Sequence, residues 1–173
     1  MKNGGDPMDL PKRKQIRLPD YDYSSPGAYF VTICARDRRC ILSYVAVGAD
    51  TLGGPILNLR AAGKVTDKYI LSISRTPGAQ VDKYVIMPNH VHLLLRISEN
   101  DAGTDSGPPR ASAPTIPNVV GTMKRLINRE LGENIWQRGY YEHVIRNEDD
   151  YREIWQYIET NPAKWAEDRY FGE

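Results

Sequence analysis

The 173-residue chain has few of the features that mark secreted or membrane proteins. It has only two cysteines, Cys34 and Cys40, and their spacing is not CxxC, so a disulfide framework is excluded and reduced thiols are expected. No apolar stretch approaches the roughly 20 residues of a membrane helix, and the first residues lack the apolar centre of a signal peptide. We therefore expect a cytoplasmic protein with no membrane partner.

The chain also lacks an excess of charge of one sign, because 23 Lys and Arg residues against 22 Asp and Glu residues leave a formal net charge of +1. Total charge thus neither favours nor excludes a nucleic-acid partner, and the distribution of the basic residues decides. A single basic run is most often a solvated surface. Three such runs occur: Lys12, Arg13, Lys14 and Arg17; Arg36, Arg38 and Arg39; and Lys124, Arg125 and Arg129.

The length suits one domain of ordinary size with polar ends. We expect a basic, polar N-terminal arm over residues 1–27, a single domain over residues 28–166 and a short tail over residues 167–173. Residues 98–118 are poor in apolar side chains and rich in Gly, Ser and Pro, which predicts a flexible insertion within the domain.

The hydrophobic periodicity predicts four strands and three helices. In chain order these are strand 28–35, helix 58–74, strands 80–87 and 90–97, helix 117–131, strand 136–145 and helix 148–160. Residues 36–43 are expected to lead out of the first strand, and residues 48–56 to form a loop. The first six elements follow the order of the ferredoxin-like fold. We therefore predict an α+β fold, a ferredoxin-like split βαβ sandwich whose antiparallel sheet carries helices on one face, plus an extra C-terminal helix.

The stretch MPNHVHLLL, residues 87–95, places two histidines in a predicted strand. His90 and His92 are two residues apart and so project from the same face, while Val91 and Leu93 point the other way. An arbitrary HxH pair most often has no special role. Here the leucines that follow predict a buried strand, and burying imidazoles costs free energy unless something bonds to them.

A closed zinc site is not expected, because no cysteine or third histidine lies at zinc-finger spacing from this pair. An open site fits better, with one more protein ligand and positions left for phosphate oxygens and water around Mg²⁺ or Mn²⁺.

The last predicted helix carries the residues that could complete such a site. Its apolar stripe is Tyr151, Ile154, Trp155 and Ile158, at helical spacing. Tyr157 lies off the stripe, and Asn161 falls four residues later on the same flank. Without the histidines, Tyr157 would be read as a boundary tyrosine and Asn161 as a C-terminal cap before a proline.

Two segments together carry a resemblance to a known family. The stretch MPNHVHLLL resembles the HUH motif (His, bulky apolar residue, His) of the single-tyrosine HUH transposases. Residues 136–165 resemble the closing segment of the REP-associated tyrosine transposases within that group, and the similarity covers about residues 12–166. The resemblance implies a ferredoxin-like, metal-dependent endonuclease and strand transferase that acts on single-stranded DNA near hairpins, in the bacterial cytoplasm close to the nucleoid.

The resemblance also implies residue roles. His90, His92 and Asn161 match the ligands of the divalent metal, Mg²⁺ or Mn²⁺, and Tyr157 matches the nucleophile. In this family cleavage leaves a 5′-phosphotyrosine and a free 3′ hydroxyl, which later attacks that bond. Because the family's substrate is a hairpin with a single-stranded guide, the basic residues become candidates for DNA contacts, with Tyr21 and Tyr23 available for stacking. These basic residues are Lys12, Arg13, Lys14, Arg17, Lys124, Arg125 and Arg129.

Several alternatives stay open from sequence. Tyr140, Tyr141 and Tyr151 are rival nucleophiles, although Tyr140 and Tyr141 point to opposite faces of a strand, so at most one could reach the site. His143 is either a third ligand or, better suited to its strand, a hydrogen-bonding residue. The protein could instead be a catalytically inactive, domesticated binder of hairpin nucleic acid, or a phosphoesterase that uses water. Monomer and homodimer are equally compatible with the sequence.

Overall fold

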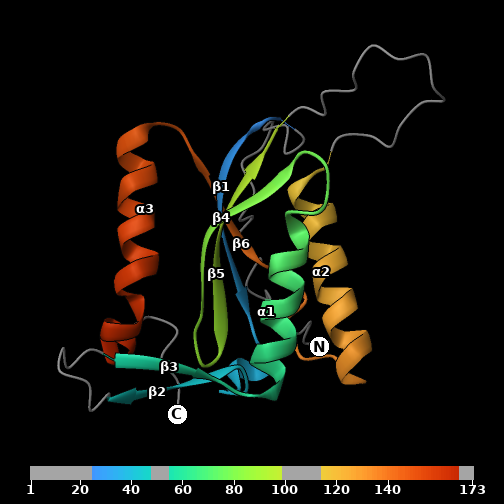
Figure 1. The fold of residues 1–173 in the computed structure, drawn as a ribbon, viewed down its shortest axis with the longest axis vertical. Coiled ribbons are helices and arrows are strands. Elements are labelled where there is room, and N and C mark those ends of the chain that lie inside the picture. The colour runs from blue at the N-terminus through green and yellow to red at the C-terminus, as the bar shows by residue number, and fades with distance from the viewer. Residues whose placement is uncertain (1–24, 48–54, 99–113, 168–173) are drawn as a thin grey trace, which may run out of the picture.

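The computed structural model describes residues 25–47, 55–98 and 114–167, and these residues form a four-stranded antiparallel sheet with helices on both faces, together with a separate two-stranded sheet (Figure 1). The sheet has the strand order β4-β5-β1-β6, with β1 at Gly27–Cys34, β4 at Ala79–Ile86, β5 at His90–Ile97 and β6 at Tyr141–Ile145. The three α-helices are α1 at Ala61–Ile73, α2 at Ile116–Leu131 and α3 at Glu148–Thr160. Strand order and helix placement confirm the predicted ferredoxin-like fold.

Helices α1 and α2 cover one face of the sheet, and their shared core contains most of the buried apolar side chains. Alternate residues of the two central strands, such as Ile33 and Leu93, point into this layer and are fully buried. They meet Ile70 from α1 and Val120 from α2. Each such side chain contributes about 1.5–3 kcal/mol relative to exposure, so this layer supplies much of the fold's stability.

Helix α3 covers the opposite face, over a smaller apolar cluster of Phe30, Val85, Met87, Leu94 and Ile158. The stripe predicted from helical spacing is thus directed toward the sheet at Ile158, which is 1 % exposed. Within the described ranges, no helix is long and apolar enough to span a membrane.

A two-stranded hairpin, β2 at Ser43–Val47 and β3 at Pro55–Leu59, was not predicted from sequence. The predicted helix start at residue 58 is wrong, because Leu59 still belongs to β3 and α1 begins at Ala61. The error has a physical source: the apolar residues of a short strand can continue the spacing of the helix that follows, so periodicity alone does not separate them.

The hairpin is packed tightly on the start of α1. The backbone N–H of Arg60 donates to the carbonyl oxygen of Leu42 at 2.9 Å, just before β2 begins. A Cβ added to Gly63 would lie 1.9 Å from that same carbonyl oxygen, so only glycine permits this approach. The close contact fixes the hairpin against the end of the sheet at which β5 begins (Figure 1).

Two further boundaries differ from the prediction. Strand β6 begins at Tyr141 rather than residue 136, because Trp136 forms only an isolated bridge with Ala35 and the next residues run outside the sheet. Helix α2 begins at Ile116, so residues 116–118 of the predicted insertion are helical, and the Thr115 side chain caps them by accepting from Asn118. The remaining insertion residues 99–113, residues 1–24 of the arm and residues 168–173 of the tail lie outside the described residues.

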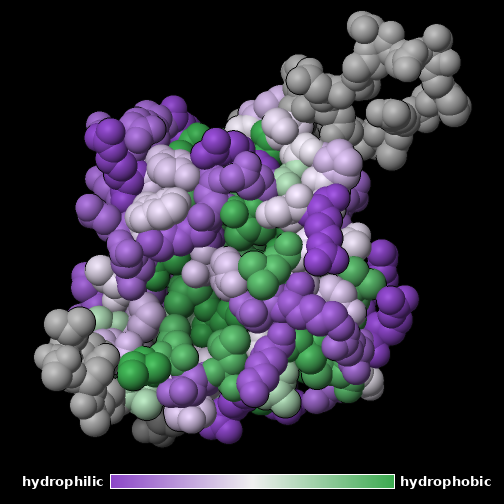
Figure 2. Space-filling model, viewed as in Figure 1, coloured by the Kyte–Doolittle hydropathy of each residue, from purple (hydrophilic) through white to green (hydrophobic). Residues whose placement is uncertain are grey.

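One face of the molecule shows the edge strand β4 between α3 and α1 (Figure 2). Apolar side chains gather in the lower half of this view, and hydrophilic side chains line α3 on the left. Polar residues of β4 contact the helices on either side of this strand.

Candidate active site

The two histidines begin the central strand β5, at the end of the sheet next to the hairpin. The preceding turn is held by backbone hydrogen bonds, in which Ala35 N donates to Asn89 O at 2.7 Å and Leu42 N donates to Pro88 O at 3.0 Å. Since β5 lies between β1 and β4, both histidines are 0 % exposed, as the following leucines predicted.

The imidazoles face each other on the α3 side of the sheet. Their Nε2 atoms are 2.9 Å apart. On the outer side of each ring, Nδ1 has an oxygen partner at 2.8 Å: Asn89 Oδ1 for His90 and Thr32 Oγ1 for His92. An amide oxygen can only accept, so Nδ1 of His90 is the donor, and in the neutral ring its Nε2 carries a lone pair. Both rings are therefore oriented with Nε2 toward a common point.

Tyr157 of α3 reaches this point from the opposite layer. Its hydroxyl lies 3.3 Å from Nε2 of His92. Its ring packs edge-on against His92, with centroids 5.1 Å apart, and against Phe30 at 5.9 Å, while Phe30 stacks on His92 at 5.1 Å. The side chain is 37 % exposed, so the phenol is held by aromatic neighbours and is still open to solvent. The predicted meeting of helix tyrosine and strand histidines is present, whereas the role of nucleophile stays a prediction.

Asn161 lies at the end of α3, where the chain enters the short helix η2 at Asn161–Glu167. It is 2 % exposed, a rare position for an asparagine, which is consistent with a constraint other than capping. Trp165 of η2 brings its ring within 5.9 Å of His90, so η2 closes one side of the site. The role of Asn161 as a metal ligand remains a prediction.

The start of α3 is fixed by a capping arrangement. The Asn147 side chain accepts from the backbone N–H of Asp150 at 2.8 Å, as an N-cap should, and the Asp150 carboxylate accepts from Arg146 N at 3.3 Å. The same carboxylate bonds to Nε2 of His143 on β6 at 2.9 Å. The hydrogen-bonding alternative for His143 is confirmed, and this residue ties α3 to the sheet.

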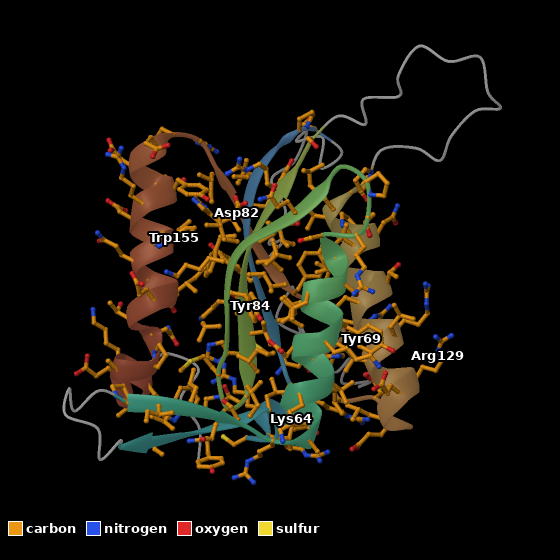
Figure 3. All side chains as sticks on the ribbon, viewed as in Figure 1. Lys64, Tyr69, Asp82, Tyr84, Arg129 and Trp155 are labelled. Atoms are coloured by element: carbon orange, nitrogen blue, oxygen red, sulfur yellow. The ribbon has the colours of Figure 1, made fainter. Side chains whose placement is uncertain are left out.

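A β-bulge in β4 holds the middle of α3. The pairing with β5 shifts between Val81 and Lys83, which places two consecutive side chains, Asp82 and Lys83, on the α3 face. The Asp82 carboxylate accepts from Tyr151 Oη at 3.0 Å, and Lys83 Nζ lies 4.3 Å from the centroid of the Trp155 ring (Figure 3). We call Asp82 and Lys83 the bulge clip.

Two more contacts complete the bulge clip. Arg96 of β5 donates to Asp82 at 2.9 and 3.1 Å, and Lys83 pairs with Glu159 of α3 at 3.2 Å. Burial, followed by the bond to Asp82, raises the pKa of Tyr151. The clip was not predicted from sequence. The structure packs both Val81 and Tyr84 on the α1 side, although they are three residues apart. In a strand, residues at this spacing share a face only where a bulge intervenes, so their spacing was the available signal.

The rival tyrosines are separated by the structure. Tyr151 is held by the bulge clip, and Tyr140 packs against the core on the α1 and α2 side. Tyr141 pairs with Thr32 in the β1–β6 register and so shares the face of the histidines, and it is 37 % exposed. At most one of Tyr140 and Tyr141 faces the site, as expected, and Tyr141 becomes the proper control for Tyr157.

The predicted DNA-binding residues of α2 differ in their surroundings. Lys124 is engaged internally, because its Nζ donates to the carbonyl oxygens of Gln137 at 2.6 Å and Gly139 at 3.1 Å, and burial lowers its pKa. Arg125 and Arg129 are exposed. The remaining predicted contacts belong to the arm and lie outside the described residues: Lys12, Arg13, Lys14, Arg17, Tyr21 and Tyr23.

Within the described ranges, no group of three or more His, Cys, Asp or Glu side chains could hold a metal ion. A closed site built from such residues is therefore absent from this part of the chain. The two imidazoles have their Nε2 atoms 2.9 Å apart, and the open metal site expected from the sequence stays a prediction.

Comparison with known proteins places these observations in a family. No family model matches the chain. A Haemophilus influenzae protein of uncharacterised function is 30 % identical over 92 % of this chain and 93 % of its own length. The Escherichia coli REP-associated tyrosine transposase is 26 % identical over 82 % of this chain and 70 % of its own length.

A solved structure described as a REP-associated tyrosine transposase bound to a REP hairpin has the same fold, with a TM-score of 0.58 and 23 % identity over 86 % of this chain and 73 % of that chain. A second Haemophilus influenzae protein, named for the same family, is 30 % identical over 83 % of this chain and 74 % of its own length. Because this relative is 30 % identical and is matched over 74 % of its own length, the chain belongs to the REP-associated tyrosine transposase family of single-tyrosine HUH transposases.

Proposed function

We propose that the protein is a metal-dependent endonuclease and strand transferase that cuts single-stranded DNA near hairpins through a covalent 5′-phosphotyrosine at Tyr157. The observation that carries the proposal is the 3.3 Å approach of the Tyr157 hydroxyl to Nε2 of His92, beside a second buried imidazole. The tyrosine of α3 and the two buried histidines of β5 meet in the layer between this helix and the sheet. The names of the relatives, which are transposases, support the same reaction class.

The residues of the site fit a divalent cation. The two Nε2 atoms are 2.9 Å apart and directed to a common point, so both imidazoles could bind the same divalent cation. The oxygen partners of each Nδ1, Asn89 and Thr32, are the outer contacts that orient ligating imidazoles. His90, His92 and Asn161 would hold Mg²⁺ or Mn²⁺, which when bound supplies charge neutralisation at a phosphate.

The chemical step assigned to the chain is attack by the phenol. The oxygen of Tyr157 forms a bond to phosphorus while the bond from phosphorus to the 3′ oxygen breaks, so the 5′ end stays on the tyrosine and a 3′ hydroxyl is released. The exposed side of the ring lets the phenol proton pass to solvent. Phe30 and His92 restrict the ring to a narrow range of orientations, which favours in-line attack. The 3′ hydroxyl reverses the step without ATP.

Hairpin DNA is the proposed partner. One structural relative is described as bound to a REP hairpin, and the exposed Arg125 and Arg129 of α2 offer positive charge for a phosphate backbone. Tyr157 and both histidines come from one chain, so a monomer would suffice for cleavage.

The test compares Tyr157→Phe with Tyr141→Phe, because the two tyrosines have equal exposure and share a face of the sheet. Each variant is incubated with single-stranded hairpin fragments of the source genome and Mn²⁺, and protein–DNA adducts are identified by denaturing electrophoresis and mass spectrometry. We expect the adduct to disappear only in Tyr157→Phe, with hairpin affinity retained in both.

Other outcomes would redirect the assignment. An adduct that survives Tyr157→Phe and vanishes in Tyr141→Phe would move the nucleophile to Tyr141. Hairpin binding with no adduct under any divalent ion would favour an inactive hairpin-binding protein. Adduct formation that is unaffected by a chelator would contradict the metal requirement at His90 and His92.

A further inference from the structure

A second cavity lies on the other face of the sheet from Tyr157, between α2 and the segment 134–140 that precedes β6. Its volume is about 390 Å³, within the range of small-molecule sites. The lining residues include two arginines, an asparagine and two aromatic residues: Arg125, Arg138, Asn128, Trp136 and Tyr140. None of its described lining residues is acidic. We call this cavity the α2 pocket.

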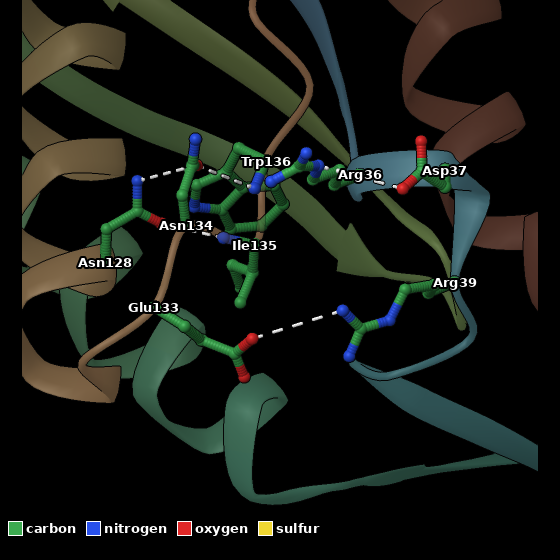
Figure 4. Close-up of polar contacts among 8 residues, drawn as sticks. All are labelled: Arg36, Asp37, Arg39, Asn128, Glu133, Asn134, Ile135 and Trp136. Carbon is green, nitrogen blue, oxygen red and sulfur yellow. Dashed lines mark hydrogen bonds and ion pairs between the residues drawn. The ribbon is translucent and has the colours of Figure 1, made fainter.

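The walls of the α2 pocket are fixed by their own hydrogen bonds. Asn128 donates to Asn134 Oδ1 at 3.0 Å and accepts from Ile135 N at 3.2 Å, and Asn134 Oδ1 also accepts from Trp136 N at 3.3 Å (Figure 4). On the other side, Lys124 binds the carbonyl oxygens of residues 137–139. Because its Nζ is bonded to these carbonyls, the partly buried Lys124 shapes the wall of the pocket rather than filling it, so the pocket exists before any ligand arrives.

One polar group in the pocket wall lacks a hydrogen bond. Trp136 is 2 % exposed, and its indole Nε1 has no acceptor among the described residues. A buried N–H of this kind is normally satisfied, since leaving it without an acceptor is costly. Because this N–H lies behind the accessible surface of the pocket, it takes no part in the ligand contacts proposed below.

The α2 pocket is joined to the histidine site by three adjacent backbone segments. Trp136 bridges Ala35, and Ala35 N donates to the carbonyl oxygen of Asn89. Asn89 in turn holds the imidazole of His90. Both sites therefore lie at the same end of β1, on opposite faces of the sheet, and one DNA strand that passes around this end could occupy both.

We propose that the α2 pocket binds one nucleotide of the substrate strand away from the cleaved bond. Arg125 and Arg138 would take its phosphate, because a guanidinium matches phosphate oxygens in charge and geometry. Its base would lie against the partly buried Tyr140. This rests on the proposed function for its ligand, and it assigns to Arg125 a different role from Arg129, which does not line the pocket.

The experiment uses the full chain and a hairpin oligonucleotide with single-stranded flanks, and measures affinity by fluorescence anisotropy. Gly121→Leu fills the pocket: Gly121 lines it, and a Cβ there would meet nothing within 4 Å, so the fold should be retained. Arg125→Gln and Arg138→Gln remove the phosphate contacts, and Arg129→Gln on the same helix tests a backbone contact outside the pocket. We expect about tenfold weaker binding or more in the three pocket variants, and a clearly smaller loss in Arg129→Gln.

The outcomes separate this proposal from the strand-transfer proposal. Equal losses for Arg125→Gln and Arg129→Gln, with wild-type affinity in Gly121→Leu, would show a nonspecific basic surface and overturn the pocket. If Gly121→Leu melts at a lower temperature than wild type, the hairpin affinity of Arg138→Gln alone decides whether the pocket binds the strand. Weakened binding in the pocket variants, in a protein that forms no adduct, would keep the pocket while removing strand transfer.

Discussion

The bulge clip should determine how firmly the nucleophile helix sits on the sheet, and Asp82→Asn tests this directly. The substitution preserves shape and removes the charge that Tyr151 and Arg96 contact. The Asp82 side chain is 5 % exposed, so its bond to Tyr151 is worth about 1.5–3 kcal/mol. The half-exposed Arg96 adds at most about 1 kcal/mol after solvent screening. We expect a loss of about 2 kcal/mol, because asparagine retains part of the bonding.

That loss acts on the docking of α3 as well as on global stability. Since about 1.4 kcal/mol corresponds to a factor of ten, the population of docked Tyr157 could fall by as much as about 30-fold. The assay is single-turnover adduct formation at saturating DNA, together with urea unfolding. Hairpin affinity should not fall, because removing a negative charge cannot weaken attraction for phosphate.

Two comparisons make the result interpretable. Asp149→Asn removes a carboxylate from the exposed first turn of the same helix and should change both readouts little. The double variant Asp82→Asn with Tyr151→Phe should lose scarcely more stability than Asp82→Asn alone, because both substitutions act on the same contact between these two side chains. Unchanged unfolding and an unchanged adduct rate in Asp82→Asn would refute the idea that the clip holds the helix.

Three further predictions concern stability. Burial, and then a hydrogen bond to Asp67, raises the pKa of Tyr84 to about 12 from 10. The contribution of Tyr84 to the free energy of unfolding is therefore complete below pH 10 and is lost as the pH rises toward 12. Tyr84→Phe should flatten this alkaline decline in stability when it is measured by urea unfolding. Gly63→Ala should destabilise by about 3 kcal/mol or more, whereas Gly121→Ala should stabilise by about 0.5–1 kcal/mol in thermal melts. Asn147→Ala should cost about 1 kcal/mol, and an unchanged melting temperature would show that the cap is redundant.

The sequence predicted the central features of the site because they depend on strict periodicities. Two-residue spacing placed His90 and His92 on one face, and helical spacing placed Tyr157 off the apolar stripe, where a flank residue can reach around to the sheet. The strand 90–97 and the helix 148–160 have the predicted bounds, since a turn or cap residue marks their starts.

The features that escaped prediction depend on contacts distant in sequence. The hairpin of β2 and β3 is stabilised by its fit against Gly63, which leaves no trace in local composition. Trp136 was assigned to a strand because it is aromatic, but its backbone serves to join the segment before β6 to the end of β1. The α2 pocket depends on Lys124 reaching carbonyl groups more than a dozen residues away, and such pairings cannot be read from periodicity.

The short connection between β6 and α3 gives the helix a mechanical property. Tyr157 is ten residues beyond the cap at Asn147, which at 1.5 Å per residue is a lever arm of about 15 Å. A tilt of only about 4° about that pivot would displace the phenol by about 1 Å, a distance that can change a rate by about two orders of magnitude. Small shifts in the angle of one helix, rather than any rearrangement of the sheet, would thus be enough to move the Tyr157 hydroxyl into or out of its position beside His92.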